Sequence, residues 1–190
     1  MSFPEVLRRI TGALEAAGVA HMLTGSFASV YYGSPRSTQD IDLVITGTPV
    51  QLRTFIEYLP RNEYYADLDA ALEAQTCESM FNVIDLKTGW KIDLIIRKAR
   101  PYSLQEFDRR QRVDLQGVSL FVASAEDVVL SKLEWAKLAH SPRQIDDAAG
   151  ILRIQGDSLD RAYLDKWVGE LNLEQEWNVA RLLARTSARS

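Results

Sequence analysis

Residues 24–45 read TGSFASVYYGSPRSTQDIDLVI, and this stretch decides the fold. A Gly-Ser pair follows the short apolar run 20–24 and precedes residues 27–32, which have room for under about two turns of helix before a glycine. The polar, proline-containing segment 34–39 predicts a loop. Acidic and apolar residues then alternate over 40–45, as they do in a half-buried strand. The stretch therefore predicts a strand, a short helix, a loop and a second strand.

Outside this stretch, the apolar spacing predicts mixed elements up to residue 123 and helices alone after it. Gly89 and Gly117 each lie in a short link between two apolar-rich runs, which is typical of a hairpin. The expected hairpin strands cover 81–86, 90–96, 112–115 and 118–122. The expected further helices cover 3–17, 49–59, 67–75, 124–139, 143–154, 158–171 and 173–186.

These elements predict a chain of the α/β (α+β) class in two parts. Residues 1–123 would form a mixed β-sheet flanked by helices, and residues 124–190 would form a helical C-terminal region. The chain has 190 residues, of which 46% are hydrophobic, and this is enough for one sizeable core or two small ones.

Composition narrows the protein class. Cys77 is the single cysteine of the sequence, so an intrachain disulfide is excluded and a cytoplasmic location is expected. No apolar run approaches the roughly 18 residues that a membrane span needs. The formal net charge of −4 gives no general attraction for a long polyanion.

The Asp-Ile-Asp segment predicts a cation site. Side chains two apart on a strand share a face, so Asp40 and Asp42 project together while Ile41 turns toward the core. Two neighbouring carboxylates repel each other unless a cation lies between them, and hard oxygen ligands suit Mg²⁺ or Mn²⁺. A solvated strand edge produces the same pattern, and this alternative stays open.

The Gly-Ser pair predicts a phosphate contact. Gly25 allows close backbone approach and Ser26 offers a hydroxyl where a helix begins, so unpaired backbone N–H groups can receive a phosphate. A simple strand-to-helix turn with a serine cap is the alternative. Together with the two carboxylates, the pair favours a site for a metal-bound triphosphate.

If two metal ions at this site promote transfer of a phosphate-containing group, a further metal-binding carboxylate is needed to activate the attacking hydroxyl. It is expected on a neighbouring strand. Asp93 is an acidic residue within the apolar run 90–96, and a buried aspartate is costly unless it is paired or bound to metal. Asp85 competes for this role, although its place near the hairpin link is typical of a turn residue.

The combined pattern resembles the nucleotidyltransferase superfamily related to DNA polymerase β. Gly25 and Ser26, then Asp40 and Asp42, then Asp93 match the three parts of its motif, within residues 20–97. The resemblance implies an NTP as donor substrate, two Mg²⁺ ions held by the three aspartates, and transfer of a nucleoside monophosphate to an acceptor.

Within that superfamily, the segments RSTQDIDL (36–43) and VIDLKTGWKIDL (83–94) look like small bacterial stand-alone members and relatives of AbiE-type toxins. By that resemblance Lys132 contacts nucleotide phosphates, Arg36 is a further nucleotide-binding candidate, and Asp147 assists. For Lys132, a solvated lysine on the helix surface is the alternative that stays open. The acceptor stays open among tRNA, protein and a small molecule. The alternatives are a toxin silenced by an antitoxin partner, and a catalytically silent nucleotide-binding module.

The other polar and aromatic residues do not predict a specific functional role. The arginines and lysine at positions 97–112 fit either a basic rim or a solvated mixed surface. His21 and His140 lack metal-ligand spacing and are expected to be structural. Trp135, Trp167 and Trp177 fall at helical positions that predict core packing.

Overall fold

The computed structural model describes residues 2–33 and 37–186, which form two compact units. Met1–Thr24 and Thr38–Val122 form the first, which we call the sheet unit. Gly25–Ser37 and Ala123–Ser190 form the second, which we call the helical unit. Residues 25–33, which the sequence analysis groups with residues 1–123, thus belong to the helical unit.

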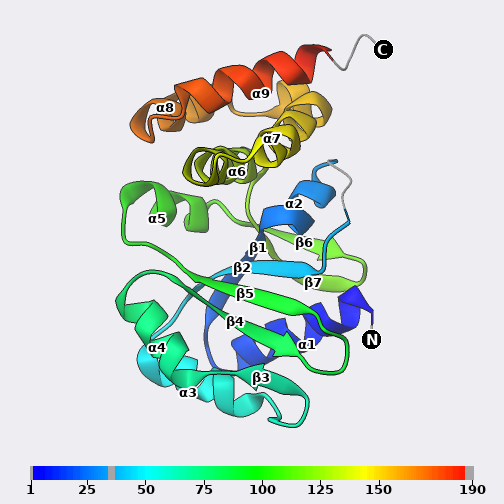
Figure 1. Cartoon of the computed structure of the whole chain (residues 1–190), viewed down its shortest axis with the longest axis vertical. Coiled ribbons are helices and arrows are strands. Elements are labelled where there is room, and N and C mark those ends of the chain that lie inside the picture. The colour runs from blue at the N-terminus through cyan, green and yellow to red at the C-terminus, as the bar shows by residue number, and fades with distance from the viewer. Residues whose placement is uncertain (1, 34–36, 187–190) are drawn as a thin grey trace. The chain divides into compact units, whose positions relative to one another are not determined.

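One mixed sheet runs through the sheet unit, with the strand order β3-β4-β5-β2-β1-β7-β6 in the described residues (Figure 1). Its centre combines two directions, because β2 is antiparallel to β1 and parallel to β5. The predicted hairpins β4–β5 and β6–β7 are both antiparallel. The strands are β1 (Ala20–Thr24), β2 (Asp40–Thr46), β3 (Tyr64–Ala66), β4 (Met80–Asp85), β5 (Lys91–Ile96), β6 (Gln111–Leu115) and β7 (Val118–Val122).

The core of the sheet unit lies on one face of the central strands. Ile41, Leu43 and Ile45 alternate along β2, and each is fully buried. Helix α1 presents an apolar stripe of Val6, Leu7, Ile10 and Leu14 and contacts β1 and β7. The helices of this unit are α1 (Phe3–Ala16), α3 (Pro49–Tyr58), α4 (Leu68–Thr76) and α5 (Pro101–Asp108). One face is therefore committed to packing, and the alternate positions on these strands face the other way.

The helical unit combines one short helix from early in the chain with the C-terminal helices. It contains α2 (Gly25–Tyr31), α6 (Ala125–Ala139), α7 (Pro142–Gln155), the 3₁₀ turn η1 (Gly156–Ser158), α8 (Arg161–Glu170) and α9 (Glu174–Thr186). Helix α2 contacts α6 and α7. The Tyr32 hydroxyl donates a 2.8 Å hydrogen bond to the Ala123 carbonyl, and Gln155 Nε2 donates one of 3.0 Å to the Tyr32 carbonyl. None of the described helices is long and apolar enough to cross a membrane.

The predicted fold class is confirmed, and the differences are local. Strand β3 was not predicted because three residues are too few to show a period of two. Helix α5 was not predicted because charged residues surround its short apolar face of Tyr102 and Phe107. Trp167 and Trp177 are buried as expected, whereas the prediction for Trp135 is wrong, since 45% of this residue is exposed.

Candidate active site

A row of polar residues crosses four adjacent strands of the sheet. The Cα of Asp42 on β2 pairs with that of Thr24 on β1 and with that of Asp93 on β5. Asp93 in turn pairs with Asn82 on β4. Residues paired across a sheet share a face, so Thr24, Asp42, Asp93 and Asn82 all project from the same side. This face is opposite the one that carries the core residues of β2.

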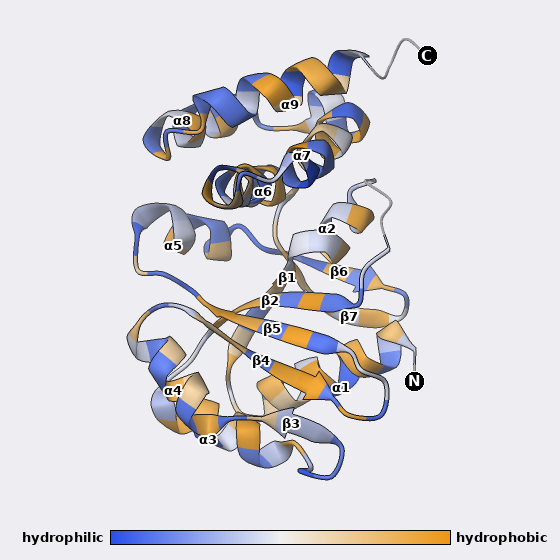
Figure 2. Ribbon diagram, in the orientation of Figure 1, coloured by the Kyte–Doolittle hydropathy of each residue, from blue (hydrophilic) through white to orange (hydrophobic). Residues whose placement is uncertain are grey.

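Asp40 lies on this face too, two residues before Asp42 and paired with Lys91. Figure 2 shows the alternation of polar and apolar residues along β2 and β5. The polar side chains differ in burial, since Asp40 is exposed, Asp42 is intermediate and Asp93 is only 7% exposed. The predicted carboxylates of the sheet unit therefore lie on one face of two neighbouring strands.

The buried Asp93 carboxylate contacts Lys91. The Lys91 ammonium donates a hydrogen bond to Asp93 Oδ2 at 2.9 Å and lies 2.9 Å from Oδ1. The hydrogen bond to Asp93 raises the pKa of Lys91, and the charges of Asp93, Asp40 and Asp42 add to this, against the opposing effect of burial. Because 42% of the Lys91 side chain stays exposed, the ammonium can turn into water, provided that another cation then supplies the positive charge that the buried Asp93 carboxylate needs.

Sequence reasoning assigned no role to Thr24 and Lys91. Thr24 Oγ1 is buried and has no hydrogen-bond partner within the described residues. Both residues could have been found from their position, because Lys91 precedes Asp93 by two on one strand and Thr24 ends the strand before Gly25. The pairing of Thr24 with Asp42, by contrast, depends on the strand order.

The donor types on this face fit a hard divalent cation. Asp40, Asp42 and Asp93 supply carboxylate oxygens, which suit Mg²⁺ or Mn²⁺. Within the described part of the chain, no three His, Cys, Asp or Glu side chains are already grouped as a metal site. The Asp93 carboxylate instead holds the Lys91 ammonium. Joint use of the three carboxylates by a cation would thus require Lys91 to move away.

Asp85, the competing carboxylate, lies on the opposite face. It is an odd number of residues from Asn82, which pairs with Asp93, so the two aspartates project to different sides. Its Oδ1 accepts hydrogen bonds from the backbone N–H groups of Lys87 at 2.9 Å and Thr88 at 3.1 Å. Asp85 is therefore the turn residue of the β4–β5 hairpin and not a neighbour of Asp42.

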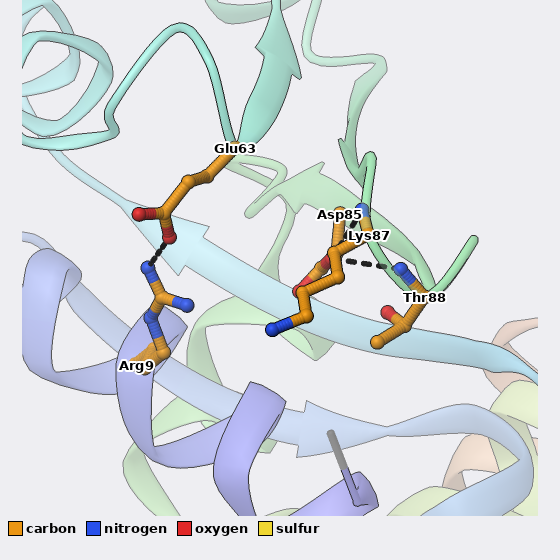
Figure 3. Close-up of polar contacts among 5 residues, drawn as sticks. All are labelled: Arg9, Glu63, Asp85, Lys87 and Thr88. Carbon is orange, nitrogen blue, oxygen red and sulfur yellow. Dashed lines mark hydrogen bonds and ion pairs between the residues drawn. The ribbon is translucent and has the colours of Figure 1, made fainter.

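Figure 3 shows the surroundings of Asp85 on that face. Arg9 of α1 forms an ion pair with Glu63, and its guanidinium lies 5.1 Å from the ring centroid of Tyr64. The hydrogen bond with Glu63 raises the pKa of Arg9, and the charge of Asp85 contributes. These contacts join α1 to the edge of the sheet, away from the predicted site.

Gly25 and Ser26 begin α2 and belong to the helical unit. Gly25 has φ +62°, a left-handed conformation that favours glycine. Ser26 is only 6% exposed. Arg36, another predicted nucleotide contact, lies outside the described residues.

Lys132 and Asp147 face each other within the helical unit. Lys132 Nζ donates a 2.8 Å hydrogen bond to Asp147 Oδ2, and the two side chains are only 4% and 9% exposed. The pair joins α6 to α7. Lys132 is therefore not a solvated surface lysine, and its ammonium is already matched by a carboxylate.

The arginines at positions 97–112 lie largely on aromatic rings of the sheet unit. The Arg110 guanidinium carbon is 4.2 Å from the ring centroid of Phe107 and 4.8 Å from that of Phe121. Arg97 also lies over Phe107, at 5.5 Å. Such stacking fixes the arginines in place.

Comparisons with known proteins give the fold. No protein-family model and no curated protein sequence matches this chain. The crystal structure of ANT(2'')-Ia in complex with adenylyl-2''-tobramycin matches with a TM-score of 0.53 and 11% identity, over 97% of this chain and 98% of that chain. The crystal structure of JHP933 from Helicobacter pylori matches with a TM-score of 0.50 and 15% identity, over 100% of this chain and 95% of that chain. The chain therefore has the fold of the nucleotidyltransferase superfamily, as its Gly-Ser and Asp-Ile-Asp motifs predicted.

Proposed function

We propose that this protein transfers a nucleoside monophosphate from an NTP to an acceptor and releases pyrophosphate. The observation that carries the proposal is the pairing of Asp42 with Asp93 on parallel strands, with Asp40 on the same face. The nucleotidyltransferase fold is consistent with this chemistry, although fold alone does not fix function.

In this proposal Asp40, Asp42 and Asp93 hold divalent cations, Mg²⁺ or Mn²⁺. Such cations neutralise charge that develops on the triphosphate as it reacts. Asp93 accepts the proton of the attacking acceptor oxygen, which forms a bond to the α-phosphorus while the bond from that phosphorus to the bridging oxygen breaks. Lys91 would leave Asp93 when a cation binds. When no cation is present, its positive charge offsets the repulsion among the three carboxylates.

The phosphate contacts of the proposal come from the sequence motif. Gly25 and Ser26 would receive the β- and γ-phosphates through backbone N–H groups and the serine hydroxyl. The resemblance also assigns nucleotide contacts to Arg36 and Lys132. For Lys132, the buried ion pair with Asp147 favours a structural role over a phosphate contact.

The acceptor can be identified by comparing three classes of compound in the same assay. The ANT(2'')-Ia structure holds an adenylylated aminoglycoside, so hydroxyl-bearing aminoglycosides form one class to test. RNA and protein form the other classes, and a toxin restrained by an antitoxin would act on one of these. Cell RNA, cell protein and aminoglycosides are each incubated with the protein, Mg²⁺ and each α-labelled NTP. We expect one fraction to become labelled.

A matched pair of variants tests the mechanism. D42N should abolish labelling and leave the unfolding temperature unchanged, because it removes a charge from a mutually repulsive group. D114N, which changes an exposed strand aspartate, should label as the wild type does. Full labelling by D42N would exclude the proposed roles of the carboxylates.

A silent nucleotide-binding module would behave differently. Such a protein would bind NTP in calorimetry and release no pyrophosphate with any acceptor. That result would retain the fold and exclude the transfer.

A further inference from the structure

The helical unit holds a pocket of about 760 Å³ among α7, η1, α8 and α9. Four arginines line what we call the arginine pocket: Arg153, Arg161, Arg181 and Arg185. Among the described residues that line it, none is acidic. The whole chain, by contrast, has a formal net charge of −4. A cluster of cations around one pocket of an acidic protein makes that pocket locally attractive to anions.

Internal ion pairs leave most of this positive charge uncompensated. The Arg161 guanidinium lies 3.5 Å from Asp157, and both side chains are more than half exposed, so the pair is weak. Arg181 lies 5.6 Å from the ring centroid of Trp177, which supplies no negative charge. Within the described residues, neither Arg153 nor Arg185 makes an ion pair.

Helix dipoles explain only part of the cluster. Arg153 and Arg185 lie in the last turns of α7 and α9, where a cation is favourable. Arg161, however, is the first residue of α8, where the helix dipole disfavours a cation. Its presence beside the other arginines points to an anion from outside the chain.

Apolar residues contribute the rest of the lining. Leu159, Leu164 and Trp177 are all buried and line the pocket beneath the more exposed arginines. The volume falls within the range of small-molecule sites, roughly 300–1,000 Å³. A bare phosphate would use the arginines and leave the apolar lining uncovered. The pocket thus suits a ligand that has both anionic groups and an apolar body.

We propose that the arginine pocket binds a nucleoside phosphate, either free or at a phosphorylated end of a nucleic acid. The planar fork of each guanidinium matches phosphate oxygens in pairs. The base and sugar would cover the apolar residues. This binding is separate from the carboxylates on β2 and β5 and from any transfer that they perform.

Calorimetry on the full chain in EDTA tests the pocket, because chelation removes the cations that the carboxylate site would use. The probes are inorganic pyrophosphate, ADP, and an oligoadenylate of about eight nucleotides with a 5′-phosphate, a length within the roughly 4–16 nucleotides that one small fold can cover. The variant R153E/R185E reverses two exposed charges of the pocket. R143E changes an exposed arginine on the same helix α7 that does not line the pocket, and it is the matched control.

We expect ADP to bind the wild type and R143E more tightly than pyrophosphate does. Binding to R153E/R185E should be about 100-fold weaker, since each charge-assisted contact is worth roughly tenfold. Tighter binding of the oligoadenylate, lost in the same variant, would support the pocket and identify a nucleic-acid end as the source.

Three results would overturn the proposal: no binding of either nucleotide probe, equal binding to R153E/R185E and wild type, or equal affinity for pyrophosphate and ADP. Circular dichroism and the unfolding temperature show whether R153E/R185E is folded. The neutral variant R153Q/R185Q replaces it if it is not, with the same expected direction.

Discussion

The two units each contain a lysine–aspartate pair, and the pairs differ in burial. Lys91 and Asp93 lie on one strand of the sheet unit, where 42% of the lysine side chain is exposed. Lys132 and Asp147 join two helices of the helical unit, where the lysine side chain is only 4% exposed. The charges of Asp40 and Asp42 also act on Lys91.

This difference separates an exchangeable counter-ion from a fixed one. A half-exposed lysine can move into water, so another cation can take its place beside the carboxylates. A lysine buried between helices, such as Lys132, cannot turn into water in this way. Loss of its aspartate partner would leave the lysine charge buried and uncompensated. We therefore expect Asp93 to matter for activity and Asp147 to matter for stability.

The largest expected effect is on transfer by D93N. In the proposed mechanism Asp93 holds the cations and accepts a proton, so its loss should lower the rate at least about 100-fold, because several kcal/mol of transition-state stabilisation disappear. The unfolding temperature should change little, since Lys91 can turn to solvent. Pyrophosphate release with the labelled acceptor measures this effect. Unchanged release would end the distinction between the two pairs.

The next effect is on stability by D147N. This change leaves the Lys132 charge buried, which costs about 3–5 kcal/mol. Denaturant unfolding followed by circular dichroism measures the loss. D157N, which changes an exposed aspartate of the same unit, is the control and should unfold as the wild type does. If D147N kept its stability and lost transfer, the structural role of the pair would be contradicted, and the role of Lys132 as a phosphate contact would be favoured instead.

A smaller effect is expected from K91M, and it should depend on metal. Without Mg²⁺ the three carboxylates lose their counter-ion, so the variant should unfold at a lower temperature than the wild type. Saturating Mg²⁺ should close most of this gap, since a ligand at about 100 times its Kd stabilises by roughly 2.7 kcal/mol. K87M, in the β4–β5 turn, is the control. The same gap with and without Mg²⁺ would contradict the exchange of Lys91 for a cation.

The smallest effect concerns His21, a buried base whose ring Nδ1 lies 3.3 Å from the Val19 carbonyl oxygen. Burial lowers the pKa of His21 below its ordinary value of 6.5. The unfolded chain then takes up a proton before the folded protein does, so the contribution of His21 to stability is complete above pH 6.5 and declines as the pH falls below it. Unfolding temperatures at about pH 8 and about pH 5 should differ less for H21Q than for the wild type. An equal pH dependence for H21Q and the wild type would show that His21 does not contribute to the loss of stability at low pH.

Local patterns predicted the carboxylates and the strands other than the three-residue β3, because side-chain alternation is a property of neighbouring residues. Asp40, Asp42 and Asp93 could be selected this way. The strand order could not, and it is the order that pairs Thr24 and Asp93 with Asp42 and places Asp85 on the other face. The Lys132–Asp147 pair also depended on helix packing, which the spacing of charges along one helix does not determine.

Because α2 belongs to the helical unit, the ribosome makes it long before the helices with which it packs. The ribosome completes α2 about 90 residues before α6, which at ordinary synthesis rates is an interval of roughly 5–20 s. During that time the partners of Tyr32, the Ala123 carbonyl and the Gln155 amide, do not yet exist. A nascent chain that stops before residue 123 therefore carries α2 without its partner helices, and limited proteolysis of stalled chains should cut first near Tyr31 and Tyr32.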